Sequence, residues 1–483
     1  MSATPMSDPS PAGKPAPDLR YAIAHPDPRS EAVLAFLFES IGVRAERADP
    51  PALWDGPHVI YGPVAEARPN GISIPEHPDD LLWAELLSGP DAVPLCGELP
   101  FDLVAAIGSF LRDDVHRDVD PAGLDRHGRL TYEASLPARE GIGDVPIVNL
   151  YVAYFGRLVR GHLGLEGLPR WPDGRRAAIG LSHDVDQPDK YAMLECFARP
   201  WRFRRLPRSA IRSTASLARA RMRDPAPRAW WLFDEVIGSE ARRGFTSTFF
   251  FAPTQFHTSH GARLDVAYDA SARRFRPVFQ ALRDGGFEVG LHAGYRAYER
   301  PAWLRAEVRR LSDAAGTEIR GNRHHYWHLG PDIEATLRSH EQAGLAYDTS
   351  LAFNDHMGFR RSVALPFRPF DTLLGRPLRT LQLPTFCMDG NLFYSSGDVD
   401  AAVAAVSDMV DRIVDTGGIG SIDWHIQTSY PANREFRAWA VAYQEILDML
   451  AGRRDIWVTD LGAIERWVSG RSADLSPGRP ALP

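Results

Sequence analysis

Two carboxylates two residues apart are the side chains whose types and spacing most directly indicate chemistry. Asp184 and Asp186 lie in the run Leu-Ser-His-Asp-Val-Asp, at the end of a short apolar stretch at residues 177–182 that predicts a buried strand. Because side chains alternate along a strand, the two aspartates are expected on one face and His183 and Val185 on the other. Two acids on one face repel each other unless a cation lies between them, and a divalent metal there would leave one carboxylate free to act as a base. A pair of capping aspartates at a turn is the alternative that this short run leaves open.

Histidines follow three later apolar runs. His292 lies in Gly-Leu-His-Ala-Gly, where the glycines leave the imidazole open to approach. His324 and His325 end the run Arg-Gly-Asn-Arg-His-His, and alternation sends them to opposite sides, so at most one of them is expected to face a metal. His425 ends Asp-Trp-His, just past another apolar run. Each cluster alone is a weak signal, but four clusters at predicted strand ends are hard to ascribe to chance.

Residues 170–468 contain the elements that must position these side chains. One predicted helix begins near Pro331 and ends at Gly344, and another has an apolar stripe with a period of 3.6 residues at 399–413. Apolar runs between the helices predict strands at 177–182, 246–252, 287–291, 318–321, 345–348, 381–385, 419–423 and 456–459.

This alternation predicts a parallel sheet with helical cover, either a (β/α) barrel or a doubly wound sheet. The polar clusters follow different strands. In a barrel the carboxyl ends of all strands open onto one mouth, so a barrel would bring the clusters together, and we favour it.

The rest of the chain predicts a smaller α/β domain at residues 19–168, flanked by tails. An amphipathic helix is expected at 30–41, ended by Gly42. Residues 1–18 are rich in proline, serine and alanine and lack the apolar stretch of a signal peptide, so a disordered lead is expected. A disordered tail is expected at 469–483. The sequence indicates no role for the 19–168 domain.

Composition and net charge limit which partners and which cellular compartment are expected. A net charge of −7 over 483 residues does not point to nucleic acid as a partner. The three cysteines lie far apart without a Cys-x-x-Cys pair, which argues for reduced thiols and against a cysteine-based zinc site. No run approaches the roughly 18 apolar residues of a transmembrane span. A cytoplasmic protein is therefore expected.

Residues 199–228 differ from the rest of the chain, because they contain ten arginines and a single acid, Asp224. Such a segment could bind a polyanion or the phosphate of a nucleotide sugar, or make a peripheral contact with an anionic membrane. The alternative is a basic insertion whose arginines are solvated or paired with acids elsewhere, and we favour that interpretation somewhat.

The order of the motifs resembles the polysaccharide deacetylase superfamily (NodB homology, carbohydrate esterase 4), in the bacterial branch with an extra N-terminal α/β domain. The motifs are Leu-Ser-His-Asp-Val-Asp, Gly-Leu-His, Gly-Asn-Arg-His-His-Tyr, Gly-Phe-Arg and Asp-Trp-His. The resemblance covers the 170–468 unit and, more loosely, residues 101–130. It implies a distorted (β/α) barrel with a divalent metal, usually zinc, that removes an acetyl group from an N- or O-acetylated sugar of a polysaccharide or its precursor.

The resemblance also implies the metal ligands. Asp186 matches the metal-binding aspartate and His292 the first metal histidine. The second histidine of the family, four residues later, is missing here, since Arg296 occupies that position. We hypothesise that His325 replaces it, because His325 occupies the proline position of the family's Arg-x-Pro-Tyr motif, on a loop at the same mouth.

Catalytic roles follow from the same resemblance. Asp184 matches the catalytic base, Arg323 would pair with it and keep it ionised, and His425 matches the general acid. The family has its two acids adjacent, whereas Val185 intervenes here, so which aspartate is the base and which the ligand stays open. Three residues are expected near the substrate: Tyr326 in the groove, Trp424 at the acetyl methyl group, and Arg360, which is more typical of a structural ion pair.

In the implied reaction, Asp184 accepts a proton from the attacking water and His425 protonates the leaving amine. The alternative is a catalytically inactive NodB-like protein that binds glycan or acts as a scaffold in exopolysaccharide biosynthesis, which the missing second histidine supports. The presence of both acids with Arg323 and His425 argues against it, because a binding protein needs neither a base nor an acid beside a metal.

Overall fold

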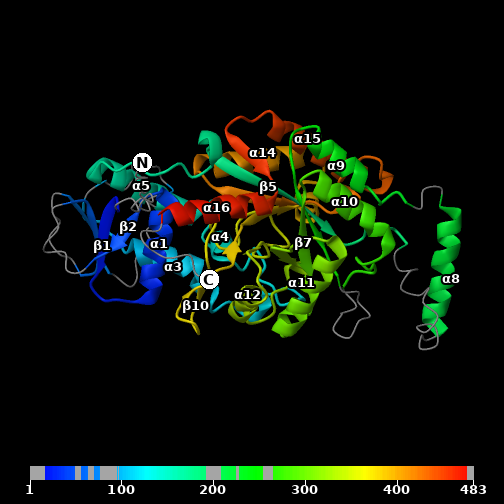
Figure 1. The fold of residues 1–483 in the computed structure, drawn as a ribbon, viewed down its shortest axis with the longest axis horizontal. Helices are drawn as coiled ribbons and strands as arrows, with labels where there is room; N and C mark the ends of the chain where they lie inside the picture. The colour runs from blue at the N-terminus through cyan, green and yellow to red at the C-terminus, as the bar shows by residue number, and fades with distance from the viewer. Residues whose placement is uncertain are drawn as a thin grey trace, which may run out of the picture. The chain divides into compact units, whose positions relative to one another are not determined.

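The computed structural model describes residues 17–48, 56–63, 70–76, 87, 95, 97–191, 208–224, 228–253 and 265–475 (Figure 1). The chain forms two compact units. The first comprises Met1–Ala105, Tyr154–Leu168 and Ser469–Pro483, and the second comprises Ala106–Ala153 and Pro169–Val468. Residues 106–153, assigned from the sequence to the N-terminal domain, therefore lie within the second unit.

The first unit contains a four-stranded parallel sheet of order β2-β1-β3-β4. Helix α1 (Pro28–Ile41) begins after Asp27, whose side chain accepts a hydrogen bond from the Ser30 amide, and it ends at Gly42 with a left-handed φ of 78°. This is the helix predicted at 30–41. The strands are β1 (Leu19–Ile23), β2 (Ala45–Arg47), β3 (His58–Tyr61) and β4 (Gly71–Ile74).

The tails differ in how far the structure describes them. Residues 1–16 of the predicted disordered lead lie outside the described residues. The tail predicted to be disordered from residue 469 is instead helical as far as Leu475, because α16 (Leu461–Leu475) continues and Leu475 is buried. Residues 476–483 lie outside the described residues.

The second unit is built on a parallel sheet of order β12-β9-β8-β7-β6-β5-β14-β13, with β15 paired to the first half of β5. Every strand pair in it is parallel. Its strands are β5 (Ala177–Val185), β6 (Thr248–Phe251), β7 (Glu288–Ala293), β8 (Gly321–His324), β9 (Tyr347–Asp348), β12 (Leu381–Gln382), β13 (Thr385–Met388), β14 (Ile419–Asp423) and β15 (Ile456–Thr459).

The two ends of this sheet are consecutive pieces of the chain. Only Leu383 and Pro384 separate β12 from β13. The Leu383 amide donates to the Asp348 carbonyl at 2.9 Å, and the Ser421 amide donates to the Pro384 carbonyl at 2.8 Å. Because the same short stretch pairs with both β9 and β14, the sheet returns on itself, and the prediction of a distorted (β/α) barrel is confirmed.

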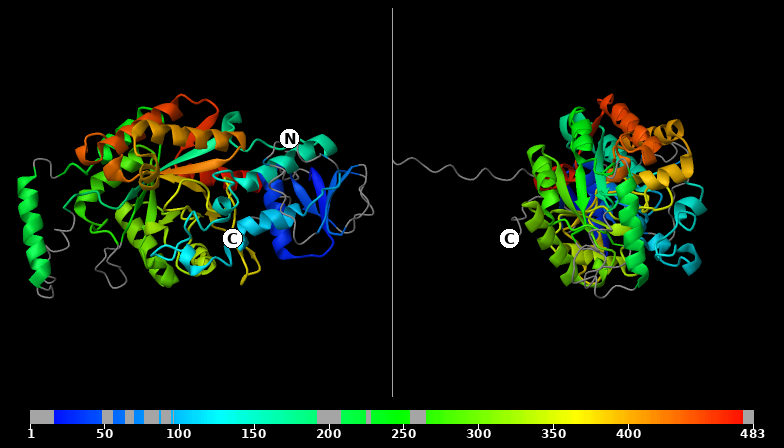
Figure 2. Two further views of the ribbon diagram at one scale, coloured as in Figure 1. Left: turned by 180° about the vertical axis from the view of Figure 1, so that it is seen from behind. Right: turned by 90° about the vertical axis from the view of Figure 1, so that its right-hand side faces the viewer.

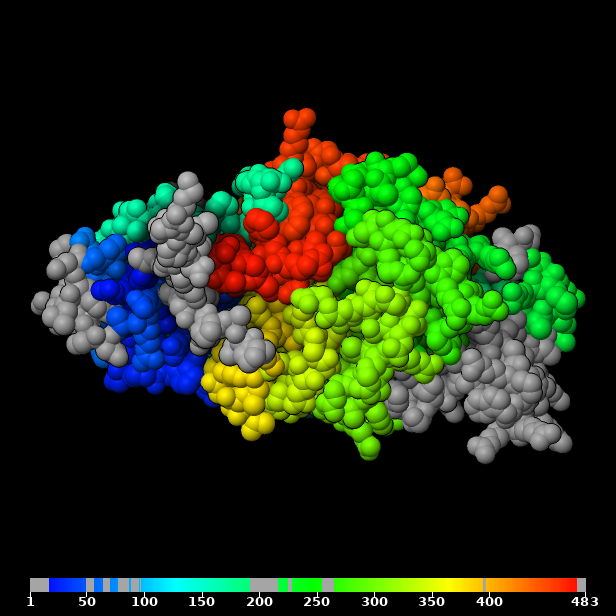
Figure 3. Space-filling model, viewed as in Figure 1, coloured from blue at the N-terminus to red at the C-terminus, as the bar shows by residue number. Residues whose placement is uncertain are grey.

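Helices lie outside the strands of the barrel (Figure 2). Apolar side chains from the outer faces of the strands pack against them, as Phe249 and Phe251 of β6 do in one core cluster. In the space-filling view, segments from the middle and the C-terminal part of the chain, in green, yellow and red, lie against one another on the visible face (Figure 3). The covering helices are α9 (Phe233–Ala241), α10 (Arg276–Asp284), α11 (Pro301–Ala315), α12 (Ile333–Gln342), α13 (Asp389–Ser396), α14 (Val399–Asp415) and α15 (Arg437–Ala451). The first turn of α16 lies at the floor of the barrel, where Leu461 and Ile464 join a core cluster with Phe250.

The remaining described elements are short or lie apart from the barrel sheet. Helix α8 (Arg208–Arg223) belongs to the basic segment 199–228, and residues 199–207 and 225–227 of that segment lie outside the described residues. Among the described helices, none combines the length and apolar character needed to cross a membrane. The others are α3 (Leu103–Leu111), α4 (Leu136–Arg139), α5 (Ile147–Leu163) and the two-residue strands β10 (Phe370–Asp371) and β11 (Arg376–Pro377).

Strand β8 differs from its prediction. It was expected at 318–321 but covers Gly321–His324. Asn322, Arg323 and His324 are all fully buried although their side chains are polar or charged. A search for apolar runs misses such a strand, because its polar side chains bind partners in other elements: Asp348, Asp184 and His340.

Candidate metal centre and active site

The side chains at the end of strand β5 alternate between the two faces, as predicted. Asp184 and Asp186 face the barrel mouth, whereas Val185 joins the apolar core outside the strand. His183 also faces outward, where its Nε2 lies 2.6 Å from Glu240 Oε1, and both side chains are fully buried. The interpretation of two carboxylates on one face therefore agrees with the structure.

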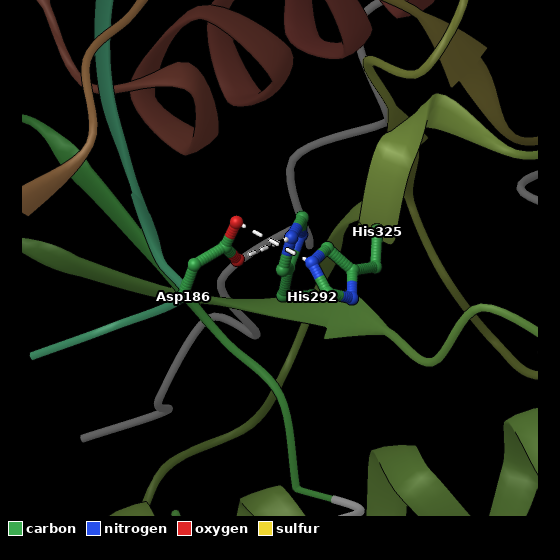
Figure 4. A group of neighbouring side chains, drawn as sticks. All are labelled: Asp186, His292 and His325. Atoms are coloured by element: carbon green, nitrogen blue, oxygen red, sulfur yellow. Dashed lines mark ion pairs between the residues drawn. The ribbon is translucent and has the colours of Figure 1, made fainter. Parts of the chain in front are cut away.

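Asp186, His292 and His325 form a compact cluster at the mouth (Figure 4). One possible ligand atom from each lies within 4.8 Å of the others. Asp186 Oδ1 is 3.1 Å from His292 Nε2, and Asp186 Oδ2 is 3.3 Å from His325 Nε2. His292 comes from β7, and His325 follows the last residue of β8. His324 points elsewhere, with its Nε2 2.9 Å from His340 Nε2.

The donor set and its surroundings fit a divalent metal. His292 Nδ1 lies 2.9 Å from the Arg323 carbonyl, so this nitrogen carries the proton and Nε2 is left as the ligand atom. His292 Nε2 and Asp186 Oδ1 are buried, and although they lie 3.1 Å apart neither makes a well-directed hydrogen bond to the described residues. Two imidazole nitrogens and one carboxylate oxygen are a ligand set that zinc takes in catalytic sites.

Electrostatics at the cluster also favour a cation. Burial alone would raise the pKa of Asp186, but the imidazoles of His325 and His292 outweigh it and lower the pKa well below its usual range. Burial alone would lower the pKa of His325, but Asp186 and Asp265 raise it to about 10. The same negative field attracts a divalent metal, which would displace the imidazole protons.

Asp184 lies beside this cluster and is held by a buried arginine. Arg323 Nη1 is 3.0 Å from Asp184 Oδ1 and 2.9 Å from Asp423 Oδ1, and the Arg323 side chain is fully buried. Burial would raise the pKa of Asp184, but His292 and Arg323 lower it. The Asp184 carboxylate is therefore ionised at neutral pH, as a base must be.

His425 approaches the same cluster from the end of β14. Its Nε2 lies 3.3 Å from Asp186 Oδ2, and its Nδ1 lies 2.8 Å from Asp389 Oδ1. The Asp389 carboxylate also accepts hydrogen bonds from the His425 amide and the Thr428 hydroxyl. Burial would lower the pKa of His425, but Asp389 and Asp186 raise it well above its usual range. The imidazolium can therefore give a proton to a leaving group.

The three residues predicted near the substrate lie in different places. Tyr326 is half-buried beside His325, with ring centroids 4.6 Å apart. Trp424 is not at the mouth: it is fully buried outside the barrel, 5.0 Å from the Tyr443 ring, because alternation points Asp423 inward and its neighbour outward. Arg360 forms an ion pair with Asp113 at 3.0 Å, the structural role that its motif also suggested.

Sequence reasoning missed Asp265, Asp389 and the inward position of Asp423. Asp265 Oδ1 accepts from the Tyr295 amide at 2.6 Å and lies 3.5 Å from His325 Nδ1. Asp389 directly follows β13, so the rule that picked out acids at strand ends would have found it had it been applied there. No local signal marks Asp265, because its position beside His325 depends on the tertiary fold.

A cavity of about 700 Å³ lies within the second unit, next to the loop that follows His325. Trp327 and His328, two and three residues after His325, form part of its wall. Arg129 and Arg360 line it from other segments, and the Arg360 Nη1 atom is buried without a hydrogen bond to the described residues. Its size is that of a small-molecule or oligosaccharide site.

Comparisons with known proteins add little to this geometry. No protein-family model matches the chain, and no curated protein matches it. Similar solved structures include one described as a polysaccharide deacetylase of Mycobacterium smegmatis, with 18% identity over 65% of this chain and 97% of that one and a TM-score of 0.40. Another is a Puue allantoinase, with 16% identity, 65% and 96% coverage and a TM-score of 0.41.

A third similar structure is described as a polysaccharide deacetylase of Pseudomonas aeruginosa PAO1, with 16% identity over 66% of this chain and 99% of that one and a TM-score of 0.40. Identities and TM-scores this low do not assign a family or a role to this chain. The chemistry of the site is therefore inferred from its own residues and their geometry.

Proposed function

We propose that this protein is a metal-dependent deacetylase of the NodB-like superfamily, which hydrolyses the N-acetyl or O-acetyl group of a sugar in a polysaccharide or its precursor. One observation carries the proposal: the Asp184 carboxylate and the His425 imidazole both border the cluster of Asp186, His292 and His325, at 3.7 Å from His292 Nε2 and 3.3 Å from Asp186 Oδ2. The order of the motifs along the sequence supports the same conclusion.

Each residue has a distinct task in the proposed reaction. A divalent metal, zinc by its donor set, would when bound lower the pKa of a coordinated water and polarise the acyl oxygen. Asp184 accepts the proton of the attacking water, and Arg323 keeps its carboxylate ionised. His425 then gives its proton to the departing group, and Asp389 holds the imidazole in place for that step.

The protonated histidine favours an N-acetyl substrate. An amine leaves far more readily once its nitrogen is protonated, so amide hydrolysis gains from a general acid next to the base. The aromatic rings of Tyr295 and Tyr326 at the mouth, with centroids 5.8 Å apart, suit the apolar faces of a sugar ring. An acetylated amino sugar is therefore the substrate class we favour, and an O-acetylated sugar is the second candidate.

Acetate release tests this proposal. The zinc-loaded protein is incubated with N-acetylglucosamine oligomers and with O-acetylated xylan, and acetate is measured by an enzyme-coupled assay. We expect acetate from at least one substrate, and release about a thousandfold slower with Asp184→Asn. Binding of the same glycans, followed by calorimetry, without acetate from any of them would contradict the proposal and support the inactive glycan-binding alternative.

A further inference from the structure

The loop that follows His325 has a strained backbone. Tyr326 has a φ of 60° and Trp327 a φ of 50°, a left-handed region that residues with a side chain rarely adopt. Two such residues in succession persist only where their surroundings hold them. His325 immediately precedes them, so the conformation of this loop determines where its imidazole lies.

His325 also lacks the strand pairing that His292 has. The hydrogen-bonded ladder between β7 and β8 includes His292 but ends at the pair Ala293 and His324, one residue before His325. Asp186 also lies one residue beyond its strand. The His325 imidazole contacts Asp186 Oδ2 at 3.3 Å through Nε2 and Asp265 Oδ1 at 3.5 Å through Nδ1. The His328 amide donates to the His325 carbonyl at 3.3 Å, and a second contact from outside the loop helps to fix its backbone.

Arg129 makes the contact that does so. Its Nη1 donates to the Tyr326 carbonyl and, at 3.0 Å, to Asn354 Oδ1. Its Nε and Nη2 donate to Asp125 Oδ2 at 2.8 and 2.6 Å. All three guanidinium nitrogens are therefore used, and the side chain is 14% exposed.

Asp125 fixes Arg129 in turn. The Asp125 carboxylate also accepts from the amides of His127 and Arg129, at 2.8 and 3.0 Å, and the Asp125 amide donates back to the Arg129 carbonyl at 2.8 Å. Burial would raise the pKa of Asp125, but the hydrogen bonds from Arg129 lower it. These hydrogen bonds fix the turn of residues 125–129, and Nη1 of Arg129 is left to contact the loop.

We propose that Arg129 is a positioning residue for the metal centre: by binding the Tyr326 carbonyl it holds the strained loop and keeps His325 at the place of the third ligand. The inference rests on the proposed function, because it assumes that His325 binds the metal. It gives residues 106–153, which precede the barrel strands in the chain, a part in the site. It also explains how a ligand from a loop can replace the histidine that Arg296 displaces.

Zinc affinity is the direct test. The affinities of wild type, Arg129→Ala, Arg129→Lys and Arg126→Ala are measured by competition with a chromogenic chelator, with no substrate present. Arg126 is the matched control, since it lies exposed on the same turn and contacts His127 instead of the loop. We expect Arg129→Ala to bind zinc about 10–100-fold more weakly, the usual effect of removing an outer-shell partner, and Arg126→Ala to bind as wild type.

Two further measurements separate positioning from a general loss of structure. Free guanidinium ion at millimolar concentration should restore zinc affinity to Arg129→Ala, because it can occupy the vacated position, and it should leave Arg126→Ala unchanged. The visible spectrum of the cobalt-substituted protein should change in Arg129→Ala and Arg129→Lys, because a displaced His325 alters the ligand geometry. Circular dichroism melting of each variant shows whether it is folded.

The outcomes distinguish this inference from the function on which it rests. Wild-type zinc affinity and an unchanged cobalt spectrum in a folded Arg129→Ala, with loss of affinity in His325→Ala, would overturn the positioning role alone. If Arg129→Ala does not fold, Arg129→Lys decides by the same two measurements. A wild-type protein that binds no zinc would overturn the proposed metal centre and this inference with it.

Discussion

The two ends of the barrel both bury carboxylates, but the pKa of Asp184 and Asp186 at the mouth shifts in the opposite direction to the pKa of Glu288 at the floor. At the mouth, Asp184 and Asp186 lie beside Arg323 and several imidazoles, which lower the pKa of each carboxyl. At the floor, Glu288 of β7 has neutral hydrogen-bond donors. Burial and the nearby Asp460 raise its pKa to about 7.

The hydrogen bonds at the floor lower the pKa of Glu288, and burial and Asp460 outweigh them. Glu288 Oε2 accepts from the Thr248 hydroxyl at 2.6 Å, the Tyr347 hydroxyl at 2.7 Å and the Gly462 amide at 2.8 Å. These bonds connect three barrel strands and the start of α16. Burial alone therefore does not create a reactive carboxylate. Cationic neighbours lower the pKa of Asp184 and Asp186, whereas burial raises the pKa of Asp423 at the mouth and of Glu288 at the floor.

Removing the cation at the mouth should have the largest effect. Arg323→Met leaves Asp184 and Asp423 buried without their partner, and we expect a loss of about 3–5 kcal/mol in the free energy of unfolding. Arg296→Met, which breaks the exposed pair with Glu299, is the control and should lose much less. Urea unfolding of both variants at one pH measures the difference. Equal losses of unfolding free energy in the two variants would contradict the claim that Arg323 stabilises the buried carboxylates at the mouth.

Removing the base should affect activity next most strongly. We expect Asp184→Asn to lower kcat/KM about a thousandfold, or about 4 kcal/mol, because an amide cannot accept the proton. Glu288→Gln at the floor should change kcat/KM less than about threefold, since it lies away from the mouth. Initial rates of acetate release measure both. A Glu288 variant as impaired as the Asp184 variant would break the distinction between the two ends.

Glu288 should make stability depend on pH. The pKa is about 7 in the folded protein against 4.5 for an unperturbed glutamate, so the stabilisation is fully present below pH 4.5 and is lost as pH rises through 7. The loss amounts to about 3 kcal/mol.

Glu288→Gln should remove this dependence, because the amide is neutral at both pH values and can still accept hydrogen bonds. Urea unfolding at pH 5 and pH 8 gives the comparison, with the exposed Glu318→Gln as control. If wild type and Glu288→Gln lose stability equally between the two pH values, the floor carboxyl is not held neutral.

The smallest effect should come from the partner of the general acid. Asp389→Asn keeps a hydrogen-bond acceptor for His425 Nδ1 but removes the negative charge that stabilises the imidazolium. We expect kcat to fall about tenfold, or about 1.4 kcal/mol, with KM little changed. Steady-state kinetics on the best substrate measure kcat and KM separately. A change confined to KM would place Asp389 in substrate binding instead.

Much of this barrel could be predicted from the sequence, because its outer strand faces are apolar and its reactive groups follow the strands. The strands at 419–423 and 456–459 agree with β14 and β15, and Asp184, Asp186 and His292 converge as expected from alternation and the common mouth. His325, placed at the site by hypothesis from its motif position, also lies within the cluster.

The rest depends on contacts that only the tertiary fold creates. Strand β8 carries buried polar side chains, so no apolar run marks it. Trp424 could be placed on the outer face only once Asp423 was known to face Arg323. The contact of Arg129 with Tyr326 joins residues 197 positions apart, and such a distance leaves no local pattern in the sequence.

Metal content tests the central claim most directly. Wild type, His292→Ala and His325→Ala are purified in parallel, exposed to zinc, desalted and measured by inductively coupled plasma mass spectrometry. The account predicts about one zinc per chain in wild type and a clear loss in both variants. No bound metal in wild type, or full zinc occupancy in His325→Ala, would contradict it.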